Sequence, residues 1–263
     1  MKQFFDTQWA VVLGASSGFG EAAVRRFAEA GLNIVGIHLD RKSTQPNADK
    51  ILADVKAMGR QAIFINMNAA DEEKRAEAVS QMKELCAGKV QILMHSLAFG
   101  ALKPFIAESK NDQLSKSQIE MTLDVMASSL VYWAQDMSEA KLFSRGARVY
   151  AMTSAGSSRV WKSYGAVSAA KAALESYIRQ LALELAPQGI CCNAILAGVT
   201  DTPALRKIPG NEEMIKTATY RNPMKRLTTP DDVAQTLVAL SLPHCSFMTG
   251  NTIRIDGGEN IVD

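Results

Sequence analysis

The sequence contains no long hydrophobic run. No stretch of about 18 consecutive apolar residues occurs in the chain, so we expect no transmembrane helix. The first residues, MKQFFDTQWAVVLG, carry one early lysine and lead into a predicted strand and a glycine-rich loop. This is not the pattern of a cleavable signal peptide. We therefore expect a cytoplasmic protein that has no membrane partner.

Neither sign of charge is in large excess. The chain has 29 lysine and arginine residues against 27 aspartate and glutamate residues, which gives a formal net charge of +2. Proteins that bind nucleic acid or an anionic membrane usually concentrate much more positive charge. The composition therefore requires neither of these partners.

Cysteine and histidine are scarce. The four cysteines show no C-x-x-C spacing, and the adjacent Cys191 and Cys192 are poor disulfide partners, so we expect reduced, buried thiols. Of the three histidines, His95 follows a predicted strand and could be a metal ligand or an acid–base group. Because no second metal ligand accompanies it, we favour a structural histidine bonded to the backbone, and we expect no metal site.

A regular alternation of strands and helices runs through the chain. With 263 residues, 47% of them hydrophobic, the chain is long enough for one large α/β domain. We expect strands at 10–14, 33–39, 61–67, 91–97, 147–154, 190–196 and 251–257, and helices at 21–31, 48–59, 72–86, 117–143, 164–185 and 231–242. This order predicts a doubly wound parallel sheet, the Rossmann fold, in a single dinucleotide-binding catalytic domain that spans residues 1–263.

A glycine-rich turn joins the first predicted strand to the first predicted helix. Glycine lets the backbone approach a pyrophosphate, and the helix N-terminus offers free N–H groups and the positive end of the helix dipole. A tight turn of small residues is the alternative, but the strand–turn–helix context favours nucleotide binding. The cofactor residues expected in this turn are Gly14, Ser16, Ser17, Gly18, Phe19 and Gly20.

The candidate catalytic residues lie between positions 154 and 171. Tyr164 stands seven residues before Lys171, almost two helical turns, so both side chains can project from one helix face. Tyrosine is a weak acid with an ordinary pKa of about 10, and a nearby ammonium favours its phenolate. Ser154 ends a strand, where it either hydrogen-bonds a substrate or caps a turn.

The glycine loop, the Ser154, Tyr164 and Lys171 set, and the closing IDGG together resemble the short-chain dehydrogenase/reductase family over the whole chain. Most members carry Tyr-x3-Lys, whereas Val167 occupies that tyrosine position here and the spacing is Tyr-x6-Lys. This spacing is similar to that of the enoyl-acyl-carrier-protein reductases of bacterial fatty-acid synthesis. A serine at position 154 resembles the branch of these reductases that usually depends on NADPH.

The resemblance implies further site residues. The segment HSLAFG, His95–Gly100, is similar to the enoyl reductase version of the family's Asn-Asn-Ala-Gly, and Met126 replaces the family's usual helix asparagine. The segment NAILAGVTDTPAL matches the loop that covers the nicotinamide, and Asn68 matches the residue that contacts adenine. Beyond the glycine turn, the implied cofactor residues are Asn68, Ala69, Ser96, Leu97, Ala98, Gly198, Thr200, Thr202 and Lys171, and the implied catalytic residues are Tyr164, Lys171 and Ser154.

Lys171 has two possible roles in this scheme. It can hold the ribose hydroxyls, which we favour, or lower the pKa of the phenol. The choice of nicotinamide depends on residues after the second strand, where the family's usual acid position falls on His38. Asp40 could bind the ribose hydroxyls of NADH, whereas Arg41 and Lys42 could neutralise the 2′-phosphate of NADPH. We favour NADPH and keep NADH open.

The leading interpretation is an NADPH-dependent enoyl-acyl-carrier-protein reductase that acts on an acyl group bound to acyl-carrier protein or to coenzyme A. The alternatives are a 3-oxoacyl or other carbonyl reductase, an alcohol dehydrogenase of the same family, and a non-catalytic NADP(H) sensor. An irregular segment at about 197–230, with a short helix at 211–220, is expected to form a lid over the substrate. By analogy with the family we expect a homotetramer.

Overall fold

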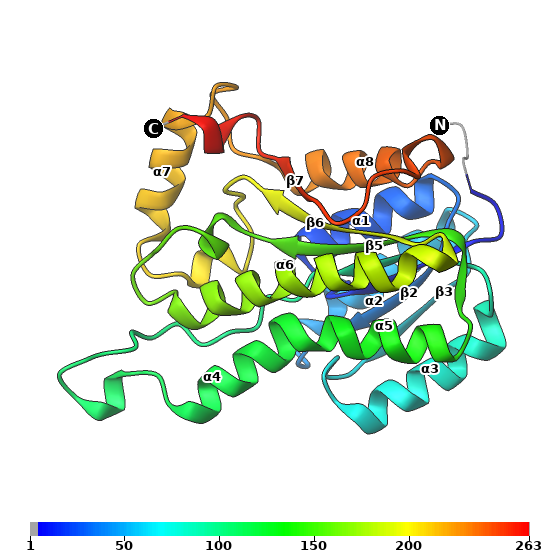
Figure 1. Cartoon of the computed structure of the whole chain (residues 1–263), viewed down its shortest axis with the longest axis horizontal. Helices are drawn as coiled ribbons and strands as arrows, with labels where there is room; N and C mark the ends of the chain where they lie inside the picture. Colours follow the sequence, from blue (N-terminus) through cyan, green and yellow to red (C-terminus); the bar gives the residue numbers. More distant parts are fainter. Residues whose placement is uncertain (1–4, 263) are drawn as a thin grey trace.

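The structure is a computed structural model that describes residues 5–262. Within these residues seven parallel strands form one sheet in the order β3-β2-β1-β4-β5-β6-β7. The predicted doubly wound α/β domain is confirmed (Figure 1). The strands are β1 Trp9–Leu13, β2 Asn33–His38, β3 Ala62–Asn66, β4 Val90–His95, β5 Phe143–Thr153, β6 Cys191–Ala197 and β7 Thr252–Ile255.

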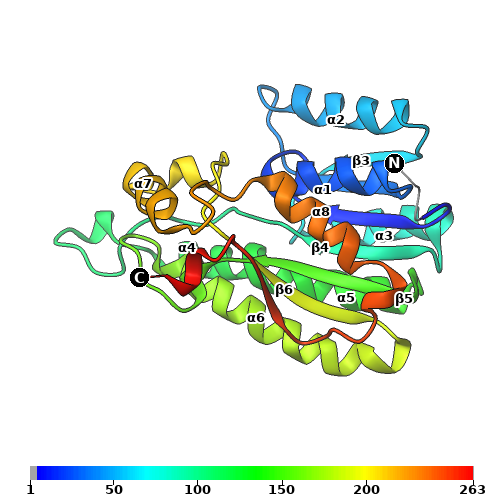
Figure 2. The same ribbon diagram turned by 90° about the horizontal axis from the view of Figure 1, so that it is seen from above.

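Helices cover both faces of the sheet. Figure 2 shows α1, α2 and α8 on one side and α3, α5 and α6 on the other, the arrangement expected when helices connect parallel strands. The helices are α1 Gly18–Glu29, α2 Gln45–Ala57, α3 Glu72–Cys86, α4 Lys116–Leu123, α5 Ser129–Glu139, α6 Gly165–Leu185, α7 Asn211–Arg221 and α8 Pro230–Leu240.

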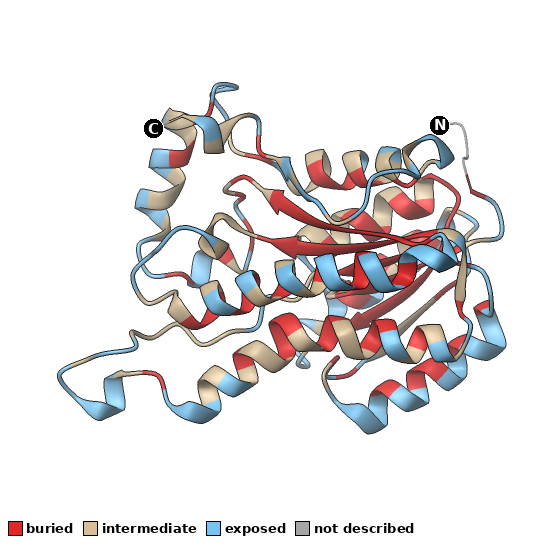
Figure 3. Cartoon of the chain, viewed as in Figure 1, coloured by how far each residue is buried: buried red, intermediate tan, exposed pale blue. Residues whose placement is uncertain are grey.

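The central strands are buried on both faces, as Figure 3 shows. All five residues of β1 are buried, and their side chains alternate between two hydrophobic cores. Val11 and Leu13 belong to the core beneath α3, α5 and α6, whereas Ala10 and Val12 belong to the core beneath α1, α2 and α8. This two-sided burial explains why the strand reads as a continuous apolar run rather than as an alternating one.

The sheet order reverses direction beside β1. From β1 the chain builds outward to β2 and β3, and then returns to place β4 on the other side of β1. In open parallel sheets the crevice at the carboxyl ends of the strands at such a point is the usual ligand site. The carboxyl ends of β1, β4 and β5 therefore position the functional residues.

Several element boundaries differ from the sequence-based expectation, most of them by a few residues at the ends of helices and strands. The helix expected at 117–143 ends at Glu139, and a π-helical turn at Asp124–Ser128 joins α4 to α5. After α5, Lys141 adopts a positive φ of 55° that redirects the chain into β5. The central helix begins at Gly165, so Tyr164 is its N-cap residue and lies just outside it, with φ −105° and ψ 4°.

The segment at 197–230 is less irregular than expected. It contains a short 3₁₀ turn at Leu205–Lys207 and α7, which matches the short helix expected at 211–220. In Figure 1, α7 stands at the edge of the domain beside the C-terminal segment. Arg221 at the end of α7 donates a hydrogen bond to the carbonyl oxygen of Val262, which holds the two together.

Two expectations from composition can be compared with the structure. Among residues 5–262, no helix has both the length and the apolar character needed to cross a membrane. The four cysteines are free thiols; Cys86, Cys191 and Cys192 are buried and Cys245 is half-buried. The expected buried thiols are therefore confirmed for three of the four.

Candidate active site

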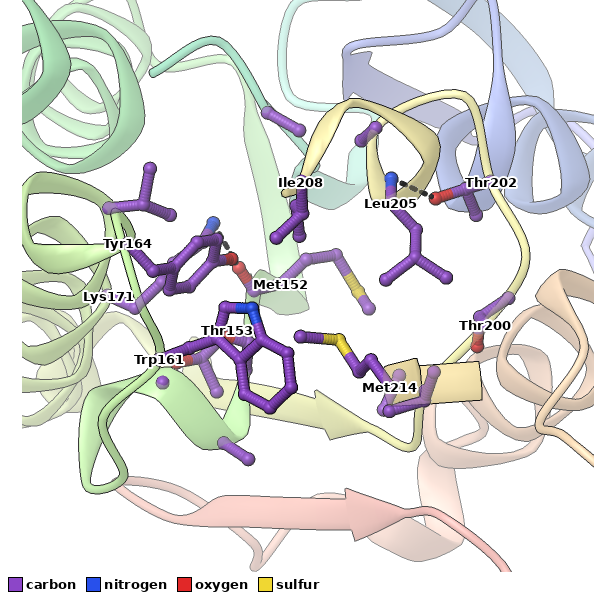
Figure 4. A pocket seen from close by; sticks show the side chains of 18 of the residues that line it. Met152, Thr153, Trp161, Tyr164, Lys171, Thr200, Thr202, Leu205, Ile208 and Met214 are labelled. Atoms are coloured by element: carbon purple, nitrogen blue, oxygen red, sulfur yellow. Dashed lines mark hydrogen bonds between the residues drawn. The ribbon is translucent and has the colours of Figure 1, made fainter. Parts of the chain in front are cut away.

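A cavity of about 490 Å³ opens at the carboxyl ends of the strands, beneath the segment at 197–230 (Figure 4). It brings together residues that are far apart in the sequence, from the glycine turn, the ends of β4 and β5, the start of α6 and the segment after β6. The predicted site residues that line it are Ser17, Gly18, Phe19, Ser96, Leu97, Ala98, Ser154, Tyr164, Lys171, Gly198, Thr200 and Thr202.

The glycine turn is closely packed against the end of β4. A Cβ atom on Gly14, which has a φ of +90°, would lie 2.4 Å from the carbonyl oxygen of Ser96. A Cβ atom on Gly20 would lie 1.9 Å from the carbonyl oxygen of Gly14. In this part of the structure Ser17 caps α1 without a side-chain hydrogen bond, which leaves backbone N–H groups for an anion. The turn therefore fits the pyrophosphate of a dinucleotide.

Lys171 lies at the base of the cavity with its side chain buried. Its Nζ donates hydrogen bonds to the carbonyl oxygen of Met152, at 2.7 Å, and to that of Leu97, at 3.4 Å (Figure 4). Burial lowers the pKa of Lys171 to about 8, although the carboxylate of Glu175 opposes the shift. The ammonium is thus held between the ends of β4 and β5 and remains charged near neutral pH.

Tyr164 points into the same cavity from the turn before α6. Burial raises the pKa of its phenol, and the neighbouring Ser154 hydroxyl opposes that rise. Lys171 is not among the causes of this shift. The phenol is therefore protonated at neutral pH, and of the two roles considered for Lys171 the structure offers no support for lowering the phenol pKa.

Ser154 follows β5 and carries a hydroxyl with unused hydrogen-bonding capacity. Its Oγ is buried and makes no capping bond to the turn that it begins. It lies near enough to the Tyr164 phenol to affect the pKa of that group, but no hydrogen bond of good geometry joins it to any of residues 5–262. A buried polar group without a partner is costly, so such a group is commonly reserved for a ligand. Of the two roles considered for Ser154, contact with a bound ligand therefore fits better than capping.

Gly156 allows these two side chains to come together. A Cβ atom at this position would lie 2.7 Å from Cε1 of Tyr164 and 3.2 Å from Oγ of Ser154. Any larger residue at position 156 would push the phenol away from the end of β5. The small residues in the stretch before Tyr164 thus have a direct role in shaping the site.

His95 is completely buried beneath the site. Its Nε2 lies 2.9 Å from Oγ of Ser129, which in turn donates a hydrogen bond to the carbonyl oxygen of Val125. Burial and the charge of Lys171 lower the pKa of His95 to about 3, so its ring is neutral. Among the described residues no cluster of potential ligands could hold a metal ion. This burial fits a structural role, but the ring contacts the Ser129 hydroxyl and not the expected backbone group, and its Nδ1 has no hydrogen-bond partner among the described residues.

Asp40 lies close to the glycine turn, outside the cavity. Its carboxylate accepts a hydrogen bond of 2.9 Å from Nδ1 of His38. Burial acts to raise the pKa of Asp40, but the hydroxyls of Ser16 and Thr44 together with His38 lower it below its usual value. This places a carboxylate beside the backbone of the turn, where the adenosine ribose of a dinucleotide would bind. The neighbouring Arg41 and Lys42 are exposed.

The remaining predicted adenosine residues also lie outside the cavity. Asn68 is exposed after β3 and its Oδ1 accepts a hydrogen bond from the backbone N–H of Ala70. Ala69 is buried, and its carbonyl oxygen accepts a hydrogen bond of 2.8 Å from the indole of Trp133. The cavity therefore contains the residues predicted for the nicotinamide and the substrate, and not those predicted for the adenosine.

The segment after β6 closes over the glycine turn. A Cβ atom on Gly18 would lie 3.5 Å from Cγ2 of Thr202, and the hydroxyl of Thr200 donates to the carbonyl oxygen of Gly198. The backbone N–H of Val199 donates to Oε2 of Glu259 at 3.0 Å. The two hydrogen bonds fix the start of the segment to itself and to Glu259, and Thr202 lies next to the glycine turn.

Several cavity residues were missed by the sequence analysis. Trp161 lies within the central stretch itself, and Glu259 directly follows the IDGG motif, so their positions gave a usable signal. Arg159 and Arg221 also line the cavity, but no local pattern marks them. Leu102 and Val167 were also missed as parts of the apolar wall. The other apolar residues of the wall include Met126, Leu205, Ile208 and Met214, which from the sequence could line an acyl groove or equally pack in the core.

Comparisons with known proteins agree with this geometry. A family model described as enoyl-(acyl carrier protein) reductase matches residues 14–260. A 1-cyclohexenylcarbonyl-CoA reductase from Streptomyces collinus is 27% identical over 257 residues, which cover 97% of this chain and 88% of that protein. An uncharacterised oxidoreductase from Mycobacterium tuberculosis is 30% identical over 257 residues, which cover 96% of this chain and 92% of that protein.

Solved structures share the fold over almost the whole chain. The enoyl-acyl-carrier-protein reductase of Bacillus cereus, solved with NADP⁺ and an indole naphthyridinone, superimposes with a TM-score of 0.88 at 22% identity and covers 99% of both chains. The L-rhamnose 1-dehydrogenase (NAD(P)(+)) of Azotobacter vinelandii, a sequence relative at 27% identity and 94% coverage of both chains, has a different substrate. The chain therefore belongs to the short-chain dehydrogenase/reductase family of NAD(P)-dependent oxidoreductases.

Proposed function

We propose that this protein is an NADPH-dependent enoyl thioester reductase of the cytoplasm, acting on 2-enoyl groups carried by acyl-carrier protein or coenzyme A. The observation that carries the proposal is the position of Tyr164. Its phenol enters the cavity from the residue before α6, three positions ahead of the buried Val167, and burial keeps it protonated. The site therefore offers a hydrogen-bond donor set back from the usual tyrosine position of the family.

The displacement suits reduction of a carbon–carbon double bond. In a carbonyl reductase the hydride reaches the carbon whose own oxygen is protonated, so the phenol must lie beside that carbon. In an enoyl thioester the hydride reaches the β-carbon while negative charge develops on the carbonyl oxygen, two bonds further away. Moving a residue three positions along a helix shifts its backbone by about 4.5 Å, at about 1.5 Å per residue.

Lys171, Tyr164 and Ser154 have different roles in the proposed reaction. The reduced nicotinamide supplies the hydride when bound. Lys171, fixed by the carbonyl oxygens of Met152 and Leu97, is placed to hold the ribose hydroxyls. Tyr164 donates a hydrogen bond to the developing enolate oxygen, and the unpartnered hydroxyl of Ser154 provides a second donor on the same side.

A carbonyl reductase or alcohol dehydrogenase is the second candidate, because several relatives carry such names, among them the L-rhamnose 1-dehydrogenase. Oxidation of an alcohol requires the tyrosine to act as a base, and a lowered phenol pKa would favour that role. The raised pKa of Tyr164 therefore favours reduction.

The proposal is tested by following the loss of NADPH absorbance with purified protein. Crotonyl thioester and acetoacetyl thioester are offered separately, each as the coenzyme A and the acyl-carrier-protein derivative. We expect oxidation of NADPH with the crotonyl substrate. Oxidation with the acetoacetyl substrate alone would instead establish the carbonyl reductase.

A further inference from the structure

Trp161 connects the catalytic turn to the segment that covers the cavity. Its indole Nε1 donates a hydrogen bond of 3.0 Å to the carbonyl oxygen of Pro209, which is 48 residues away in the sequence. Its backbone carbonyl accepts a hydrogen bond of 3.2 Å from the N–H of Tyr164. One residue therefore contacts both the phenol-bearing turn and the covering segment.

The indole also packs on the turn that begins α7. Gly210, the N-cap residue of α7, has a φ of +78°, and a Cβ atom there would lie 3.4 Å from Cζ2 of Trp161. The indole therefore lies within van der Waals reach of this turn. Trp161 and the Pro209–Gly210 turn together form what we call the tryptophan clasp.

The clasp forms part of the cavity wall. Trp161 lines the cavity, and in the view of Figure 4 its ring lies between Tyr164 and Met214. Ile208 of the covering segment lines the same cavity. The side chain is 37% exposed, so its outer edge reaches the rim while its inner edge faces the cavity. Removing the ring would open the cavity towards solvent at this point.

We propose that Trp161 is a specificity-determining residue that limits the size of the acyl group by closing the cavity against the Pro209–Gly210 turn. This inference rests on the proposed enoyl thioester reductase function. A rigid aromatic wall accepts short acyl groups and excludes long ones, because further methylene groups would have to displace the indole from a well-packed contact. The hydrogen bond to Pro209 keeps the wall in place.

The test compares Trp161→Ala and Trp161→Phe with the wild-type protein. Tyr220→Ala serves as a matched control, because Tyr220 is an aromatic residue on α7 that is 80% exposed and does not line the cavity. The measurement is kcat/KM for 2-enoyl-CoA substrates with four, eight and twelve acyl carbons. We expect Trp161→Ala to raise the ratio for twelve over four carbons by about tenfold or more. Tyr220→Ala should stay near the wild-type ratio, and Trp161→Phe, which keeps an aromatic ring but loses the hydrogen bond to Pro209, should lie between the wild-type protein and Trp161→Ala. An unchanged ratio in Trp161→Ala would overturn the proposal.

A second measurement separates the clasp from the chemistry. Arg206 and Lys207 are exposed on the covering segment, so trypsin cleavage there reports how firmly the segment is held. We expect faster cleavage in Trp161→Phe, which loses the hydrogen bond to Pro209 and the part of the indole that contacts the Gly210 turn, than in Tyr220→Ala. Equal rates would refute the clasp. If the wild-type protein reduces no enoyl thioester, both the proposed function and the proposed acyl selectivity are wrong. The proteolysis rates would still show whether Trp161 holds the covering segment.

Discussion

The ammonium of Lys171 donates a 2.7 Å hydrogen bond to the carbonyl oxygen of Met152, the last residue but one of β5. Together with the carbonyl oxygen of Leu97, this bond holds the cation against the ends of two neighbouring strands. The phenol of Tyr164 shares the cavity but has its pKa raised by burial, with no contribution from the ammonium. In the proposed mechanism the two residues act separately, Lys171 on the cofactor and Tyr164 on the substrate.

The pH dependence of kcat/KM for NADPH should follow the protonation of Lys171. Because burial lowers its pKa to about 8, the free protein carries the ammonium below that pH and loses it above. We expect kcat/KM for NADPH to fall as the pH rises through about 8, since a neutral amine holds the ribose hydroxyls less strongly. In Lys171→Arg, whose guanidinium stays charged, this decline should disappear at the cost of a lower maximum. A wild-type profile that stays flat from pH 7 to 9.5 would contradict the assignment.

The phenol of Tyr164 should contribute to turnover and not to cofactor binding. We expect Tyr164→Phe to lower kcat by about 100-fold or more, the usual range for loss of a proton donor. The dissociation constant for NADPH, measured by fluorescence, should change little. Tyr220→Phe removes a hydroxyl that is exposed on α7 and serves as the control. Turnover close to the wild-type value in Tyr164→Phe would remove the phenol from the mechanism.

The variant Ser154→Ala should show whether the Ser154 hydroxyl serves catalysis or the stability of the fold. Its hydroxyl has no partner among the described residues, so Ser154→Ala should leave the melting temperature unchanged or slightly raised. We expect kcat with crotonyl thioester to fall by about tenfold or more in the same variant, because one of two donors to the enolate oxygen is lost. A fall in stability with unchanged turnover would instead assign the hydroxyl to the fold.

The choice between NADPH and NADH depends on two groups at the end of β2. We expect NADPH to be preferred, and the double variant Arg41→Ala/Lys42→Ala to weaken NADPH binding by about tenfold or more with little effect on NADH. Asp40→Asn should not weaken NADPH. If NADH binds better than NADPH and Asp40→Asn weakens it, the carboxylate that His38 holds is the ribose ligand instead.

Local patterns in the sequence were sufficient for the fold. The apolar run at β1, the glycine turn and the regular alternation of strands and helices predicted the parallel sheet and the nucleotide-binding end of it. The π-helical turn at Asp124–Ser128 was not predictable, because its residues fit an ordinary helix and packing alone decides the distortion.

The site itself was predicted as a set of residues but not as an arrangement. Tyr164 was expected inside the helix, and its place one residue outside depends on the preceding turn, held by the hydrogen bond to Trp161. The contact of Trp161 with Pro209 spans 48 residues, so no periodic pattern contains it. The unused hydroxyl of Ser154 likewise follows from what its neighbours do not offer, which only the folded chain defines.

The carbon that receives the hydride distinguishes reduction of an enoyl double bond from reduction of a carbonyl group. Purified protein is given crotonyl thioester with NADPH that carries deuterium at both C4 positions of the nicotinamide, and the product is analysed by NMR and mass spectrometry. The account predicts butyryl thioester with one deuterium on the β-carbon, formed much more slowly by Tyr164→Phe. No deuterium in a butyryl product, together with deuterium at the hydroxyl-bearing carbon when acetoacetyl thioester is supplied, would contradict it.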